Sequence, residues 1–325
     1  MVVAVKEEVV PTQAGKAGSL DKFWHLANAK KNASRIEASS RLLKLAANNP
    51  TEADYTMKRL IRGLASPVES SRQGFFICLV EFLRQHPVEY QTVQQEVKEI
   101  LKVCGSKGEE SLYLLGQILA DIALLRSGAV KTKPDRVKVL ENLIENGSKR
   151  SYLHLITINT IIEYFLCDGS EIAPEDLVNS LEESFKLKLP EAGLDSLLFV
   201  LSFFAMKGKD TSPEFLTDNF GFKDISKKKN LQRISKIMLE TTLPLRNITT
   251  HPALKVLVQQ VCEKKAAGKL FHYFLPEMTT VYKGQIGIAL LRYIKSNYFV
   301  VTFYHRRLLN LRFLCVSTYL FCVDV

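Results

Sequence analysis

The sequence predicts an all-α protein, built as an α-solenoid of armadillo- or HEAT-like helical repeats, and three observations lead to this prediction. Apolar residues recur every three or four positions along most of the 325-residue chain, which is the spacing of one helix face. Glycine, proline and capping residues interrupt this pattern at short intervals, as they do where short helices end. The alternation of apolar and polar residues that is typical of strands is scarce before residue 290.

Composition narrows the class of protein. With 46% hydrophobic and 24% charged residues, the chain can build a core. Its net charge of +10 favours acidic partners, which include nucleic acid, an anionic membrane face or acidic protein segments. The six cysteines form no CxxC pair, which indicates a reducing compartment without disulfides. No signal-peptide core and no run of about 18 uncharged apolar residues is found, so we expect an intracellular, soluble protein.

The first helices are bounded by caps and breakers. Residues 1–18 are expected to form a flexible lead, and Ser19 starts the first helical stretch. Asn32 can cap the second stretch, which the run Asn48-Asn49-Pro50 ends. Thr51 is expected to cap the third helix.

The clearest pattern lies between residues 54 and 87 and predicts two consecutive helices. The apolar positions of these helices are Tyr55, Leu60, Ile61 and Leu64, followed by Phe75, Phe76, Leu79, Val80 and Leu83. Ser66-Pro67 is expected to open the second helix and His86-Pro87 to end it. The intervening "SPVESSRQG" contains no active-site motif, so the two helices are expected to present a surface rather than to surround chemistry.

The helical pattern continues to about residue 283. A stripe of apolar residues within 88–104 predicts the next helix, which Gly105 closes. The remaining expected helices are 108–127, 134–146, 149–167, 174–187, 190–206, 228–242, 252–267 and 270–283. The side chains that we expect to be mostly buried are Leu60, Leu64, Phe76, Leu79, Leu83, Ile100, Leu115, Ile122, Ile161 and Phe165.

Successive pairs of these helices span roughly 40 residues, which favours stacked two-helix repeats over a compact helical bundle. A bundle of this size would need several helices that are apolar all round, whereas most of these keep a polar face. The predicted organisation is therefore a flexible lead over 1–18, a repeat domain over 19–290, and an atypical tail over 291–325.

The sequence contains no recognisable motif for catalysis, cofactor binding or metal binding. "GKAGS" and "GSKGEE" lack the glycine–lysine spacing of a phosphate-binding loop. The six histidines are isolated and form no HExxH motif or Cys/His cluster. No GxSxG elbow or kinase signature occurs. The sequence therefore predicts a protein that is not an enzyme and that has no cofactor, metal site or small-molecule substrate.

Two short motifs have both a binding and a structural interpretation. "LDSLL", residues 194–198, has the LxxLL spacing with which a short helix docks into a receptor groove, but its leucines can equally line the core. Lys227, Lys228 and Lys229 could form an import signal or an anion-binding patch, or could simply be solvated at a helix start.

Four cations of the 54–87 stretch are the other candidates for partner binding. Lys58, Arg59 and Arg62 lie within about one helical turn, and Arg72 begins the next helix, so the four could line one edge of the stack. A guanidinium can hold a carboxylate or phosphate through two hydrogen bonds. The structural alternative is that Arg72 caps the turn or bridges a neighbouring carboxylate such as Glu69 or Glu52.

The same stretch resembles a known family. "KRLIRGLASPVESSRQGFFICLVEFL" is similar to the N-terminal region of the Myb-binding protein 1A family, also called the DNA polymerase V or polymerase phi family. Lys58 to Ala65 and Glu69 to Phe75 stand where that family has an "RLIRGLASSRESAR-GF" type of turn. "FWHLANAKKNASRIEASSRLLKLA" and "GEESLYLLGQILADIALLRSG" add support, and "HPALKVLVQQV" with "LFHYFLPEM" is a weaker echo. The resemblance covers residues 19–290.

The resemblance implies a protein of the nucleus and nucleolus with armadillo-like repeats. Such a protein would bind transcription factors or other nuclear proteins, with DNA or RNA as further partners and no membrane. It would act in transcription regulation of ribosomal RNA genes and in ribosome biogenesis. The family also implies a far longer chain with a basic end, so the last 33 residues look like a truncated or aberrantly spliced end.

Two other functions remain open. The family name suggests a nucleic-acid-binding enzyme with DNA polymerase activity, although no paired-aspartate motif for two-metal nucleotidyl transfer is found in the sequence. A nuclear transport adaptor is the second alternative, because transport receptors also use helical repeats.

Overall fold

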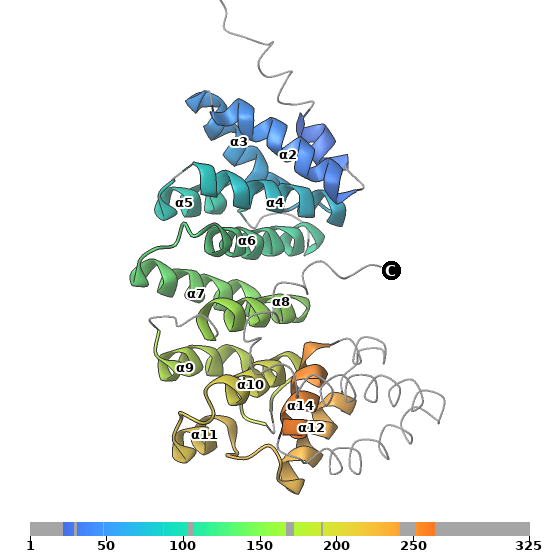
Figure 1. Ribbon diagram of the computed structural model, residues 1–325, viewed down its shortest axis with the longest axis vertical. Helices are drawn as coiled ribbons and strands as arrows, with labels where there is room; N and C mark the ends of the chain where they lie inside the picture. The colour runs from blue at the N-terminus through green and yellow to red at the C-terminus, as the bar shows by residue number, and fades with distance from the viewer. Residues whose placement is uncertain are drawn as a thin grey trace, which may run out of the picture. The chain divides into compact units, whose positions relative to one another are not determined.

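The computed structural model describes residues 22–28, 31–47, 49–86, 88–102, 107–166, 172–189, 191–240 and 251–263. Within these ranges all regular structure is helical and no strand occurs (Figure 1). The predicted all-α class is therefore confirmed. The chain forms two compact units that divide between Arg150 and Ser151.

The described part of the first unit contains six long helices and a short helical segment over 22–28 (Figure 1). The six helices are α2 (Asn32–Ala47), α3 (Pro50–Gly63), α4 (Glu69–Gln85), α5 (Tyr90–Ile100), α6 (Lys107–Ser127) and α7 (Lys133–Ser148). Most neighbours in sequence pack together, as α2 does with α3, α3 with α4 and α6 with α7. Each of these also packs against the helix after next, since α2 contacts α4, α4 contacts α6 and α3 contacts α5.

The start of α3 lies two residues before the expected one. Asn49, not Thr51, is the cap, because its side-chain oxygen accepts a hydrogen bond of 3.0 Å from the Thr51 backbone nitrogen. Pro50 takes the first helical position, where its fixed φ fits and its missing N–H costs nothing. The following helix, α4, begins at Glu69, two residues after the expected Ser66-Pro67 opening.

The core follows the predicted apolar positions closely. Of the ten side chains expected in the core, eight are at most 9% exposed: Leu60, Leu64, Phe76, Leu79, Leu83, Ile122, Ile161 and Phe165. Ile100 and Leu115 are only partly buried. The reason is that each adjoins a residue that faces the core more directly, Leu101 in the first case and Leu114 in the second.

The second unit is arranged around one helix, α10. Its elements are α8 (Ser151–Ile161), a π-helical turn η1 (Ile162–Leu166), α9 (Pro174–Phe185), α10 (Leu194–Met206), α11 (Pro213–Phe220), α12 (Lys228–Glu240) and α14 (Pro252–Glu263). Helix α10 packs against α8, η1, α12 and α14. Nine of its residues, from Leu194 to Phe203, are buried. From Ser196 to Phe203 this helix is enclosed on every side, unlike the half-exposed helices that the sequence predicts.

Several expectations for the second unit need correction. The helix expected over 190–206 begins only at Leu194, with Gly193 as its N-cap residue. The short helix α11 was not expected from the sequence at all. The "LDSLL" leucines are buried, at 9% exposure or less, so they line the core rather than offer a docking motif. The helix expected over 270–283 and the atypical tail over 291–325 lie outside the described residues.

Gly74 lies where the backbone of α4 passes close to the backbone of the segment 22–28. A Cβ atom on Gly74 of α4 would lie 2.7 Å from the backbone oxygen of Leu26. Nearby, the Ser71 hydroxyl donates a hydrogen bond of 2.6 Å to the Ala27 carbonyl. The segment 22–28 therefore lies directly against α4 where only glycine leaves room.

Replacing Gly74 with alanine is expected to lower the free energy of unfolding by about 1–3 kcal/mol, because the added methyl group forces the two backbones apart. Urea denaturation of the full chain measures this change. Gly108→Ala is the matched control, since no atom lies within 4 Å of its added Cβ and the free energy of unfolding should rise by about 0.4–1 kcal/mol. Equal effects of the two substitutions would contradict the close approach.

Candidate interaction surfaces

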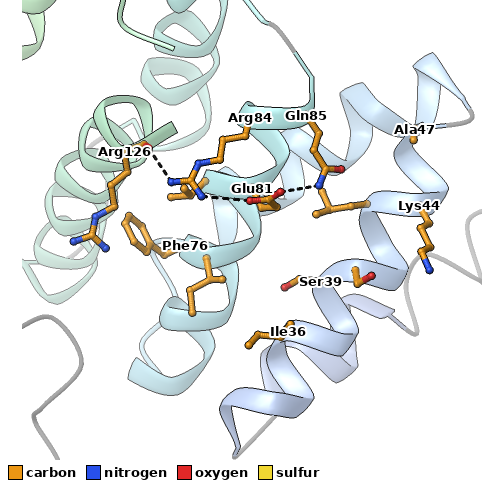
Figure 2. A pocket seen from close by; sticks show the side chains of 13 residues that line it. Ile36, Ser39, Lys44, Ala47, Phe76, Glu81, Arg84, Gln85 and Arg126 are labelled. Atoms are coloured by element: carbon orange, nitrogen blue, oxygen red, sulfur yellow. Dashed lines mark hydrogen bonds and ion pairs between the residues drawn. The ribbon is translucent and has the colours of Figure 1, made fainter. Parts of the chain in front are cut away.

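A groove of about 640 Å³ runs between α2 and α4 in the first unit (Figure 2). We call it the α2–α4 groove. Helix α2 contributes Ile36, Ser39, Ser40, Leu43, Lys44 and Ala47, helix α4 contributes Phe76, Ile77, Val80, Glu81, Arg84 and Gln85, and α6 adds Arg126. On α2 these positions recur every three or four residues, and on α4 every four. Each wall is therefore one continuous face of a helix.

The floor of the groove is apolar. Leu43, Phe76 and Val80 form it, at 4%, 9% and 7% exposure, where α2 packs onto α4. Ile36 stands at the edge with 61% of its surface exposed. An apolar floor with an exposed apolar side chain at its edge is a surface that another protein can cover.

The rim of the groove is polar and mainly basic. Arg84 donates hydrogen bonds to the Arg126 carbonyl at 3.1 Å and to Glu81 at 3.5 Å (Figure 2). Gln85 donates to the other oxygen of Glu81 at 2.8 Å. The guanidinium of Arg126 lies over the Phe76 ring, 5.7 Å from its centroid. Lys44 stands on the opposite, α2 wall, so three cations and one carboxylate border the apolar floor.

The four cations singled out on α3 and α4 have different environments. Lys58 forms ion pairs with Asp54 at 3.0 Å and with Glu96 of α5 at 3.3 Å. The hydrogen bond to Asp54, with that to Glu96, raises the pKa of Lys58 above its usual value. Arg59 lies over the Phe23 ring, 5.5 Å from its centroid.

Of the two remaining arginines, Arg72 makes a structural contact and Arg62 is exposed. Arg72 donates a hydrogen bond of 2.6 Å to the Ser66 carbonyl and so fastens the turn between α3 and α4. This is a backbone contact, in place of the carboxylate partners Glu69 and Glu52 considered from the sequence. Arg62 is exposed, and its guanidinium has no hydrogen bond or ion pair with any other residue that the structure describes.

Lys227, Lys228 and Lys229 are all exposed at the start of α12. The Lys227 carbonyl accepts the first hydrogen bonds of that helix, each of 3.0 Å, from the backbone nitrogens of Asn230 and Leu231. Asp224 fixes the preceding turn through a 3.0 Å bond from the Ser226 backbone nitrogen. The three lysines therefore lie at a well-defined helix start. In sequence they are far from the cations of α3.

A buried polar network, which no sequence pattern indicates, joins three helices of the first unit. Gln94 of α5 donates to Asp121 of α6 at 2.5 Å and accepts from Asn142 of α7 at 3.3 Å. Asp121 is only 2% exposed. Burial raises its pKa to about 7, against the opposing effects of the Gln94 hydrogen bond and of Lys98. The network ties α5, α6 and α7 together.

A histidine–aspartate pair joins two helices of the second unit. His251 bonds Asp195 of α10 through Nε2 at 2.9 Å. Its Nδ1 accepts a bond of 3.2 Å from the Ala253 backbone nitrogen at the start of α14. Both ring nitrogens are therefore engaged, and the pair fastens α14 to α10.

The comparisons with known proteins settle the family. A family model described as DNA polymerase phi matches residues 55–275, about two thirds of the chain. The chain belongs to the DNA polymerase phi family. It is similar to the Myb-binding protein 1A-like protein of Danio rerio, with 24% identity over 259 residues, which are 78% of this chain. Those residues are 20% of that protein, so the chain spans about a fifth of its length. No solved structure matches the chain.

The match to the DNA polymerase phi family confirms the resemblance seen in residues 58–75. It begins at Tyr55, inside α3, so α4 lies within it and α2 lies before it. Among the residues that the structure describes, no group of three or more histidine, cysteine, aspartate or glutamate side chains could hold a metal ion. None of the described helices is both long and apolar enough to cross a membrane.

Proposed function

We propose that this protein is a nucleolar interaction scaffold and transcription co-regulator that acts in ribosomal RNA gene transcription and ribosome biogenesis by binding transcription factors or DNA. The observation that carries the proposal is the family match over residues 55–275. The name of the Danio rerio relative, a Myb-binding protein 1A-like protein, supports a protein partner in the nucleus. The net charge of +10 is compatible with acidic partners, including nucleic acid.

The proposed architecture of the first unit is a stack of two-helix repeats of the armadillo or HEAT kind. The pairs would be α2 with α3 and α6 with α7, whose helices pack on each other, with α4 and α5 as the pair between them. Contacts of α2 with α4, of α4 with α6 and of α3 with α5 support this pairing, because equivalent helices of adjacent repeats meet in such stacks. Repeat stacks provide long surfaces that bind other macromolecules.

We propose binding rather than catalysis as the activity. The described surface of the first unit offers an apolar groove with a basic rim and an exposed arginine, Arg62. Two of the other cations predicted to bind a partner, Lys58 and Arg72, are engaged with residues of the fold itself. These features suit the recognition of acidic or phosphate-bearing partners.

Nucleolar retention tests the proposal. We expect the full chain, fused to a fluorescent protein, to concentrate in nucleoli and Arg62→Glu to reduce that concentration. The reason is that Arg62 has no described partner within the fold, so its reversal changes the surface charge without breaking a structural contact. Fluorescence imaging gives the nucleolar share of the signal, and thermal melting checks folding.

Two further variants make the result interpretable. Lys138→Glu reverses another exposed cation, on α7, and should leave retention unchanged. Arg59→Glu removes the contact with the Phe23 ring, so it is also expected to lower stability by about 0.5–1 kcal/mol. Exclusion of the full chain from nucleoli would contradict the proposal. Loss of retention only in variants whose melting temperature also falls would contradict a role of Arg59 and Arg62 in partner contact.

A further inference from the structure

We propose that the α2–α4 groove binds an acidic amphipathic helix of a partner protein, with the apolar face of that helix on the floor and its carboxylates at the rim. This inference rests on the proposed function as a protein-interaction scaffold and specifies the chemistry of one partner. The length of the groove, its apolar floor and the charges that border it all fit such a helix.

The length of the groove matches a short helix. Along α2 its lining runs from Ile36 to Ala47, and along α4 from Phe76 to Gln85. At 1.5 Å per residue these faces extend for about 16 Å and about 14 Å, which is close to three helical turns. A helical segment of about 12 residues would contact the whole groove.

The floor selects the apolar face of that helix. Leu43, Phe76 and Val80 are buried by the packing of α2 on α4, and they leave an apolar surface between the two helices. Ile36 extends this surface at 61% exposure. Leucine-type side chains of a partner, spaced three and four residues apart, fit such a groove and remove the Ile36 side chain from water.

The rim selects acidic over basic segments. Arg84 and Lys44 stand on opposite walls, so carboxylates on both flanks of a seated helix meet cations (Figure 2). The Arg126 carbonyl and Glu81 already orient Arg84, which lowers the entropic cost of binding a carboxylate. A basic occupant meets like charges. This disfavours the chain's own end, where Arg306, Arg307 and Arg312 lie.

Fluorescence anisotropy with the purified full chain tests the inference. The probe is a labelled synthetic peptide of about 12 residues with leucines on one helical face and glutamates on the other. A second peptide has lysine at every glutamate. We expect saturable binding of the acidic peptide, about tenfold or more tighter than binding of the basic one, and weaker at high salt.

Substitutions locate the binding. Arg84→Glu and Lys44→Glu are each expected to lower the affinity for the acidic peptide about tenfold and to raise the affinity for the basic peptide. Ile36→Asp should weaken both peptides, because it places a charge on the apolar path. Lys138→Glu, a charge reversal on α7 outside the groove, is the control and should change neither. Circular dichroism verifies that each variant is folded. Because there are two rim variants, the test still works if one of them fails to fold.

Three outcomes overturn the inference. The acidic peptide fails to bind, or both peptides bind alike, or Lys138→Glu weakens binding as much as the rim variants do. Self-association seen by sedimentation and abolished by Arg84→Glu would show that a second copy occupies the groove instead. Because the assay uses purified components, loss of nucleolar retention with intact peptide binding counts against the proposed function alone. Retention that persists without peptide binding counts against the groove alone.

Discussion

Replacing Phe203 with alanine is expected to lower the free energy of unfolding of this protein by about 3–5 kcal/mol. Phe203 lies on α10 and has 0% of its surface exposed. Its ring centroid is 5.1 Å from that of Phe220, 6.2 Å from that of Phe199 and 6.3 Å from that of Phe215. Removing the ring leaves a cavity that the surrounding aromatic side chains can fill only in part.

Urea denaturation followed by circular dichroism measures the effect of Phe203→Ala on the full chain. Met206→Ala, on the same helix at 38% exposure, is the matched control and should cost about 1 kcal/mol or less. A loss at Phe203 no larger than at Met206 would mean that α10 is not the enclosed centre of the second unit.

The second large effect concerns the buried carboxyl of Asp121. Its pKa is raised to about 7 in the folded protein, whereas an unfolded aspartate titrates near 3.9. The folded state therefore binds a proton more tightly than the unfolded state does. Stability from this group is fully present below about pH 4 and is lost as pH rises to about 7, by an amount on the order of 4 kcal/mol.

Asp121→Asn should remove this loss. At pH 8 the variant is expected to be more stable than the unsubstituted chain, because the neutral amide avoids the burial of a charge while it can still accept the bond from Gln94. At pH 5 the difference should shrink. Free energies of unfolding at several pH values between 5 and 8 give the comparison.

Glu141→Gln is the control for Asp121→Asn, because it removes one exposed carboxylate from α7 of the same unit. That carboxylate keeps its water in the folded protein, so its removal carries no comparable desolvation. If the stability difference between Asp121→Asn and the unsubstituted chain does not change with pH, Asp121 is ionised throughout this range and the proposed titration is wrong.

Helices with one apolar face could be predicted from the sequence, and Leu60 and Leu64 show why. Spacing of three or four residues identifies the buried face of an amphipathic helix without knowledge of its neighbours. The start of α10 is hard to place from the sequence because the unbroken apolar run Leu197 to Leu201 marks no single buried face. Helix α11 has only eight residues, too few for a periodic pattern. Its Ser212-Pro213 start, with a 3.2 Å bond from the Phe215 nitrogen to Ser212, was a usable signal.

The candidate surfaces were harder to predict, because they depend on contacts between residues distant in sequence. Spacing indicated that Arg59 and Arg62 share a helix with the buried Leu60, but not that Arg59 covers the Phe23 ring. The partner of Arg72 is a backbone carbonyl, which no side-chain pattern reveals. The α2–α4 groove exists only because α2 packs beside α4, so neither helix shows it alone.

The central claim is that this protein works by binding other nuclear proteins through its first unit. Quantitative affinity capture from nuclear extract, with the full chain and its Arg62→Glu, Arg84→Glu and Lys138→Glu variants as baits, tests this claim most directly. We expect nuclear proteins that co-purify with the unsubstituted and Lys138→Glu chains but are depleted with Arg62→Glu or Arg84→Glu, at equal melting temperatures. If all four baits capture the same proteins, or none is enriched over an unrelated basic helical protein, the claim is contradicted.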